Sequence, residues 1–131
     1  MNLKKSVMLA LLPLFVLSVV AAASASADNI RIEQIGFGYS DVVEQGASLN
    51  ARIRVTPYDV AALKDTRIRV YVPELNAYGA ARPFEATRNS NELRTVTIPI
   101  YEDVASADYY ARIVVYSDGA KRVVHRPFSV Q

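Results

Sequence analysis

Two runs rich in β-branched and aromatic residues, 109–117 and 120–130, meet at the dipeptide Asp118-Gly119. Asp-Gly supplies the two positive φ angles of a type I′ turn, whose twist matches that of paired antiparallel strands. The sequence therefore predicts a hairpin at the end of the chain. The remaining strands must pair with this hairpin or cover one of its faces.

A two-residue loop at this turn fixes which residues lie opposite one another, and opposed residues share a face of the sheet. Tyr116 is expected opposite Lys121, and Arg112 opposite His125. The other face is more apolar, so it is the predicted core face. Its apolar residues are Ala111, Ile113, Val115, Val124, Phe128 and Val130.

Most of the chain before the hairpin alternates between apolar and polar residues, as strands with one buried face do. The alternation is clean in residues 47–56, 66–72 and 94–100. Residues 30–37 change phase midway, which predicts a bulge in an edge strand. Pro99 favours an edge position for its strand.

Two stretches lack this alternation. Residues 58–65 are predicted to form a connection with a helical turn that Asp59 can cap. Residues 74–81 are predicted to form a loop, and Pro83 restricts a short strand around Phe84 to an edge. Short strands at regular intervals, without a convincing helix, predict an all-β sandwich or barrel.

Residues 1–27 contain two lysines, then a long apolar run, then Ala25-Ser26-Ala27, which is typical of a cleaved secretory signal peptide. The alternative is an uncleaved membrane anchor, because the apolar run approaches the about 20 residues that span a bilayer. We therefore expect residues 28–131 to form a single domain that is secreted, in the periplasm or at the cell surface.

The charge balance argues against a nucleic-acid partner. The chain has 15 Lys and Arg against 13 Asp and Glu, and two of the lysines lie in the predicted signal, so the mature domain is formally neutral. It also lacks cysteine, which excludes a disulfide framework. Stability must come from packing and strand pairing.

Four short motifs follow one another in the second half of the chain. They are Val72-Pro73-Glu74-Leu75, Ile98-Pro99, Tyr109-x-x-Arg112-Ile113 and His125-Arg126. In this order they resemble the immunoglobulin-like repeats of prokaryotic secreted and cell-surface proteins, of the type described as CARDB or S-layer-associated domains. The first half of the chain resembles them more weakly.

The resemblance implies an all-β fold, an immunoglobulin-like antiparallel β-sandwich of about seven strands. It also implies that Tyr109 donates a hydrogen bond back to the preceding backbone, as a tyrosine at this corner does. Such repeats usually have glycine before the corner, whereas this chain has Ser106-Ala107-Asp108. The matched motifs are structural and bring no catalytic or ligand-binding residues with them.

The sequence offers little for catalysis. His125 is the only histidine, so a metal site or a histidine-based nucleophile lacks partners. Glu102, Asp103 and Asp108 could bind Ca²⁺, but their spacing is unspecific and a solvated turn is the favoured interpretation. We therefore expect no enzyme activity, no cofactor and no metal.

One face carries a binding hypothesis. In an immunoglobulin-like fold, strand 66–72 pairs with the hairpin, so the outward residues of both join in one surface. Arginine and tyrosine are enriched among interface anchors, and aromatic platforms can hold sugars. The other interpretation is a solvated sheet face. The candidate residues are Arg67, Arg69, Tyr71, Tyr110, Arg112, Tyr116, Lys121 and His125.

The sequence thus predicts a non-catalytic structural or binding module of the cell envelope. Its partner would be an envelope or surface protein, bound through this face or by strand addition at a sheet edge. The alternative is a module that binds a polysaccharide or another anionic polymer through the same face, although the chain has no tryptophan for sugar stacking. A membrane partner is expected only if the signal stays uncleaved.

Overall fold

The computed structural model describes residues 26–38, 40–89 and 93–131. The predicted signal peptide therefore lies outside the described residues, apart from Ser26 and Ala27. No helix among the described residues is long and apolar enough to cross a membrane. Their helical elements are two short 3₁₀ turns, η1 (Ala27–Asn29) and η2 (Pro73–Leu75).

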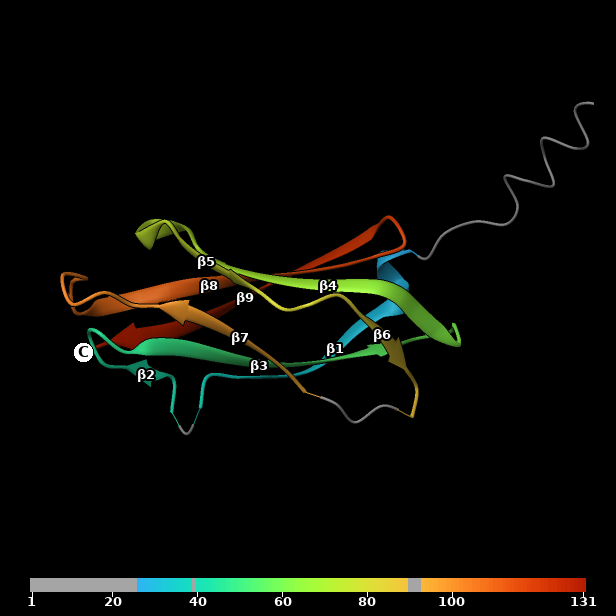
Figure 1. Ribbon diagram of the computed structural model, residues 1–131, viewed down its shortest axis with the longest axis horizontal. Coiled ribbons are helices and arrows are strands. Elements are labelled where there is room, and N and C mark those ends of the chain that lie inside the picture. The colour runs from blue at the N-terminus through green and yellow to red at the C-terminus, as the bar shows by residue number, and fades with distance from the viewer. Residues whose placement is uncertain (1–25, 39, 90–92) are drawn as a thin grey trace, which may run out of the picture.

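The described residues form two β-sheets that lie one over the other (Figure 1). The smaller sheet has three strands in the order β1-β3-β7, and the larger has the order β2-β9-β8-β4-β5, with β6 paired to β4 beside this path. The strands of the smaller sheet are β1 (Ile30–Gly36), β3 (Ser48–Pro57) and β7 (Arg94–Pro99). Those of the larger are β2 (Val42–Val43), β4 (Ala62–Val72), β5 (Ala77–Ala80), β6 (Phe84–Thr87), β8 (Ala107–Ser117) and β9 (Ala120–Val130).

This order is that of an immunoglobulin-like β-sandwich. Strands β1, β3 and β7 take the places of strands A, B and E, and β4, β8 and β9 take those of C, F and G. Strand β5 extends the second sheet beyond β4, as the additional strands of variable-type domains do. All pairings are antiparallel except that of β2 with β9, which is parallel.

The predicted hairpin and its register are confirmed. Strands β8 and β9 pair from Ser117 opposite Ala120 onward, which places Tyr116 opposite Lys121. At the turn, Asp118 and Gly119 have φ angles of 47° and 81°, as a type I′ turn requires.

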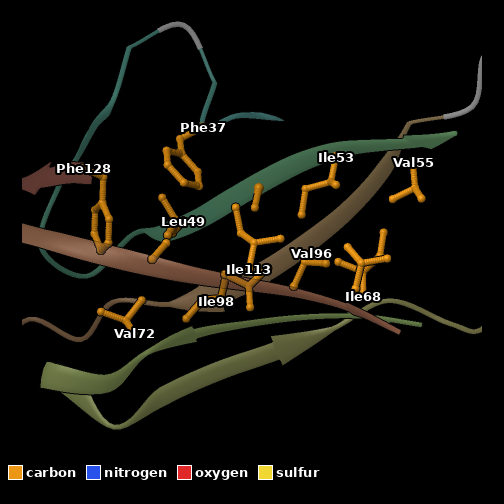
Figure 2. Close-up of a cluster of buried hydrophobic side chains, with 14 of the residues drawn as sticks. Phe37, Leu49, Ile53, Val55, Ile68, Val72, Val96, Ile98, Ile113 and Phe128 are labelled. Atoms are coloured by element: carbon orange, nitrogen blue, oxygen red, sulfur yellow. The ribbon is translucent and has the colours of Figure 1, made fainter. Parts of the chain in front are cut away.

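The core lies between the inward faces of the two sheets (Figure 2). Leu49 and Ile53 of β3 are fully buried, as is Ile113 of β8 on the facing sheet. Phe128 closes one end of the core, with its ring centroid 6.0 Å from that of Phe37. The predicted core face of the hairpin is confirmed, except that Val124 on β9 is only partly buried.

The predicted connection at residues 58–65 is wrong in its second half, because β4 already begins at Ala62. Its first half bends without the predicted helical turn, and Asp59 has a φ angle of 61°. The pairing of β4 with β6 shifts register between Leu63 and Thr66, and Asp65 has a φ angle of 48°. This bulge breaks the alternation on which recognition of a strand depends.

The predicted loop at residues 74–81 is also wrong in part, because it contains β5. A Cβ atom at Gly79 would lie 2.6 Å from the carbonyl oxygen of Thr97. Strand β5 thus lies against the edge of β7, where only a residue without a side chain fits. With β5 and the two-residue β2, the described residues form nine strands rather than about seven.

The two strands of the smaller sheet that the sequence places at an edge do lie at its edges. Strand β1 lies at one edge, with a register shift between Ile32 and Gln34, and β7 lies at the other edge with Pro99 at its end. A bulge and a proline both weaken an edge as a template for further strands.

Candidate functional site

Pairing across β5, β4, β8 and β9 arranges the outward residues of the larger sheet in rows. The rows run perpendicular to the strands, and each residue lies opposite its neighbour in the register. We call this surface the arginine–tyrosine face. Its rows are Lys121, Tyr116 and Arg67; Val123, Val114, Arg69 and Ala80; and His125, Arg112, Tyr71 and Tyr78, with Tyr110 beyond them.

All of the predicted binding residues therefore lie on one surface. Tyr78 also lies on this surface and is absent from the predicted residues, because the sequence predicts a loop at residues 74–81. Tyr78 is 57% exposed and stacks on Tyr71, with ring centroids 5.5 Å apart and an angle of 25° between the rings. The only sequence signal for it is one aromatic residue between Ala77 and Gly79.

Arg69 lies at the centre of the face. Its guanidinium carbon is 5.6 Å from the centroid of the Tyr116 ring, a cation–π contact. A side-chain hydrogen bond with Tyr71 raises the pKa of Arg69 above its ordinary value. Since arginine is charged at any pH at which proteins are folded, Arg69 is a fixed cation whose position two tyrosines define.

Val114 is an apolar residue that is buried on the outer side of the larger sheet. It points outward, in the row of Arg69, yet it is only 3% exposed. Long side chains such as those of arginine and tyrosine cover apolar surface with their stems and rings. The larger sheet therefore buries apolar surface on its outer side as well as toward the core.

The hairpin end of the face is balanced in charge. Arg67 Nε lies 3.5 Å from Asp65 Oδ1, and both side chains are at least half exposed, so the pair adds little stability. A hollow of about 330 Å³ at this end is lined by both residues and also by Arg69 and Asp118. Two cations and two carboxylates therefore surround it.

The opposite end of the face has a hollow of about 400 Å³ beside η2. Asn76 closes η2 in the left-handed conformation, with φ 50° and ψ 36°, and turns the chain back into β5. This hollow contains one cation and no carboxylate. Its lining residues are Tyr71, Pro73, Asn76, Ala77, Tyr78 and Arg112.

Arginine alone does not distinguish this face from the rest of the molecule. The outer side of the smaller sheet carries Arg31 and Arg52, paired with Thr56 and Thr95 respectively. Tyr58, beyond the end of β3, lies 4.2 Å from the Arg31 guanidinium carbon. The arginine–tyrosine face differs in the number of its tyrosines, which are Tyr71, Tyr78, Tyr110 and Tyr116.

Tyr109 and Asp108 make hydrogen bonds within the fold. The hydroxyl of Tyr109 donates a hydrogen bond to the carbonyl oxygen of Ala105, 2.7 Å away, which is the bond that the family resemblance implies. Ser129 donates its hydroxyl hydrogen to Asp108, one of the carboxylates considered for Ca²⁺. Within the described part of the chain, no three His, Asp or Glu side chains are grouped closely enough to hold a metal ion.

No protein family matches the chain, and no curated protein matches it in sequence. Among solved structures, it is similar to the sulfur carrier protein SoxY from Chlorobium limicola f thiosulfatophilum. The two are 15% identical, with a TM-score of 0.44, over 83% of this chain and 84% of that chain. No functional inference follows from a likeness of this extent.

Proposed function

We propose that the protein is a non-catalytic binding module of the cell envelope. Its arginine–tyrosine face would bind an acidic surface of an envelope or surface protein. The observation that carries this proposal is the set of contiguous rows across the larger sheet, which contain cations and tyrosines but no carboxylate.

The chemistry of the rows supports a protein partner. Arginine and tyrosine are the residues most enriched among the side chains that dominate binding energy. Arg69 is already held by Tyr71 and Tyr116, and Tyr78 is stacked on Tyr71. Side chains that are positioned before binding lose less conformational entropy in the complex, which favours affinity.

The surroundings of His125 support a non-catalytic role. Its neighbour across the hairpin is Arg112, a cation, rather than a carboxylate that could orient a general base. The row of His125 contains no carboxylate, so it offers no acid–base pair.

The predicted signal peptide supports a location outside the cytoplasm, where the partner would be a periplasmic or surface protein. Nucleic acid is not proposed, because the mature domain is formally neutral. The alternative partner is a polysaccharide or another anionic polymer, favoured by the aromatic hollow beside Asn76.

Capture of partners from the native cell envelope tests the proposal. The face variant is Arg67→Glu with Lys121→Glu, two exposed cations on either side of Tyr116 in one row. The control variant is Arg31→Glu with Arg52→Glu, which makes the same change of charge on the outer side of the other sheet.

We expect the parent and the control variant to retain the same proteins, and the face variant to lose them. Loss from both variants would show that only net charge matters, and retention by both would show that the face is not the binding surface. Either result would overturn the proposal. Retention of polysaccharide instead of protein would replace it by the alternative.

A further inference from the structure

The chain builds the hollow beside η2 from a strand, a turn and a return strand. Pro73 opens η2 directly after β4, and the amide of Asn76 donates a hydrogen bond to the Pro73 carbonyl oxygen, 3.2 Å away. The antiparallel return of β5 then places Tyr78 opposite Tyr71. On the other side of Tyr71, β8 contributes Arg112.

The walls of this hollow suit a ligand with a ring that has an apolar face. Its volume of about 400 Å³ lies in the range of small-molecule sites. Tyr71, Tyr78, Pro73 and Ala77 supply aromatic and aliphatic surface, which is the predominant lining of such sites. The stack of Tyr71 on Tyr78 fixes both rings, and Tyr78 remains accessible to solvent.

The polar groups that line the hollow favour a ligand that carries both a negative charge and hydroxyl groups. Arg112 is exposed, and a guanidinium binds a carboxylate through two parallel hydrogen bonds. The Asn76 amide and the tyrosine hydroxyls can donate and accept hydrogen bonds, as the hydroxyl groups of a sugar require. Glu74 is exposed on η2 but does not line the hollow.

The hollow at the hairpin end lacks this selectivity. Asp65 and Asp118 line it together with Arg67 and Arg69, so an anion entering it would meet as many negative as positive charges. Arg67 is also engaged with Asp65 at 3.5 Å. Of the two hollows, the one beside η2 is therefore the better site for an anion.

We infer that the hollow beside η2 binds a single uronic acid unit, a sugar ring that carries a carboxylate. Arg112 binds the carboxylate, a tyrosine ring packs against the C–H face of the sugar, and Asn76 binds a hydroxyl group. This ligand is additional to the proposed protein partner, and its binding does not depend on that partner.

An NMR titration of the exported, isotope-labelled protein tests the inference. Glucuronic acid is the probe, glucose is the neutral counterpart, and benzoate is a carboxylate on a ring without hydroxyl groups. We expect glucuronic acid to shift the backbone amide signals of Asn76 and Ala77, with a Kd on the order of 1 mM, as befits a ligand of this size. Glucose should bind at least about tenfold more weakly, because it lacks the charged hydrogen bonds.

Three outcomes of this titration would overturn the inference. Equal shifts with glucose would show that the carboxylate does not contribute to binding. Stronger shifts with benzoate would identify an aromatic acid as the better ligand. Absence of any shift at Asn76 and Ala77 with glucuronic acid would exclude the site itself.

Variants locate the site within the face. Arg112→Gln and Tyr78→Ala should each lower the affinity for glucuronic acid about tenfold. Because both side chains are exposed, the signals of Asp118 and Gly119 at the hairpin turn should stay unchanged. Lys121→Gln removes a cation of the same face outside the hollow, and should leave the affinity within about twofold because a distant exposed charge is screened. An equal loss in Lys121→Gln would mean diffuse charge attraction and would overturn the site.

The protein-capture variant separates this inference from the proposed function. Arg67→Glu with Lys121→Glu leaves the residues that line the hollow intact. It should no longer capture the protein partner, but its affinity for glucuronic acid should stay the same. Loss of the sugar titration in that variant would contradict a site confined to the hollow.

Discussion

The hydroxyl of Ser117 donates a hydrogen bond to the backbone carbonyl oxygen of Lys64, 2.8 Å away. Lys64 and Asp65 lie inside the bulge of β4, between the residues that pair with β6. The neighbouring carbonyl oxygen of Leu63 accepts a hydrogen bond from the hydroxyl of Thr66 at 2.9 Å. Two buried hydroxyl groups thus satisfy carbonyl groups at the point where β4 turns toward the arginine–tyrosine face.

Ser117→Ala tests this relationship. The variant should lower the free energy of unfolding in urea by about 1–2 kcal/mol, because the Lys64 carbonyl loses a hydrogen bond that water cannot readily replace. Ser117 is 1% exposed, whereas Ser106 is exposed in the connection before β8. Ser106→Ala is therefore the control and should have no measurable effect. Equal effects in the two variants would show that the bulge does not depend on Ser117.

Gly79→Ala should destabilise the protein through a steric clash. Its Cβ atom would lie 2.6 Å from the carbonyl oxygen of Thr97 and 2.9 Å from Val96 Cγ1. Overpacking of this kind costs about 1–3 kcal/mol, which a lower midpoint of thermal unfolding would report. At Gly36, an added Cβ meets nothing within 4 Å, so Gly36→Ala is the matched control. A Gly79→Ala protein as stable as this control would refute the close approach of β5 to β7.

Tyr109→Phe should lower the free energy of unfolding by about 1 kcal/mol, because the bond to the Ala105 carbonyl oxygen is lost while the ring stays. The ring should keep its contact with Phe128, whose centroid is 5.9 Å away. Tyr110, the next residue, is 58% exposed, so Tyr110→Phe should leave the free energy of unfolding unchanged. Unfolding in guanidinium chloride would measure both variants. A neutral Tyr109→Phe would mean that the bond does not stabilise the corner.

The exported protein should begin at Asp28, which the mass of the intact chain would show. Cleavage there removes the Ser26 contacts of Asn29 but leaves both hydrogen bonds between Asn29 and Tyr58, at 2.8 and 2.9 Å. Strand β1 therefore keeps its attachment to the end of β3. Ala25→Arg should block processing, since the cleavage site requires small residues. An unprocessed parent chain would instead support the membrane anchor.

The parts of the fold that were predictable depend on neighbouring residues in the chain. Asp118 and Gly119 specify their turn locally, and the turn in turn fixes the register that places Arg112 beside His125. The phase change in residues 30–37 likewise marks the bulge of β1. These features need no knowledge of distant contacts.

The missed elements depend on contacts that are remote in sequence. Position 79 accepts only glycine because β7 lies against it. Nothing in the sequence of residues 74–81 indicates this contact. The bulge at Asp65 is stabilised partly by Ser117, far along the chain. Because β5 went unrecognised, the candidate site lacked Tyr78, and with it the aromatic stack that forms the hollow.

The parallel pairing of β2 with β9 has a geometry that resists a pulling force. The start of β1 and the C-terminus lie at opposite ends of the sandwich (Figure 1), so tension between them acts along the strands. The amides of Ser129 and Gln131 donate to the carbonyl oxygens of Asp41 and Val43, at 2.7 and 2.9 Å. Such bonds lie across the direction of pull and must be sheared together rather than peeled apart in sequence. Rupture under force is governed by the unfolding rate, so we expect loss of these bonds to lower the rupture force more than it lowers the free energy of unfolding.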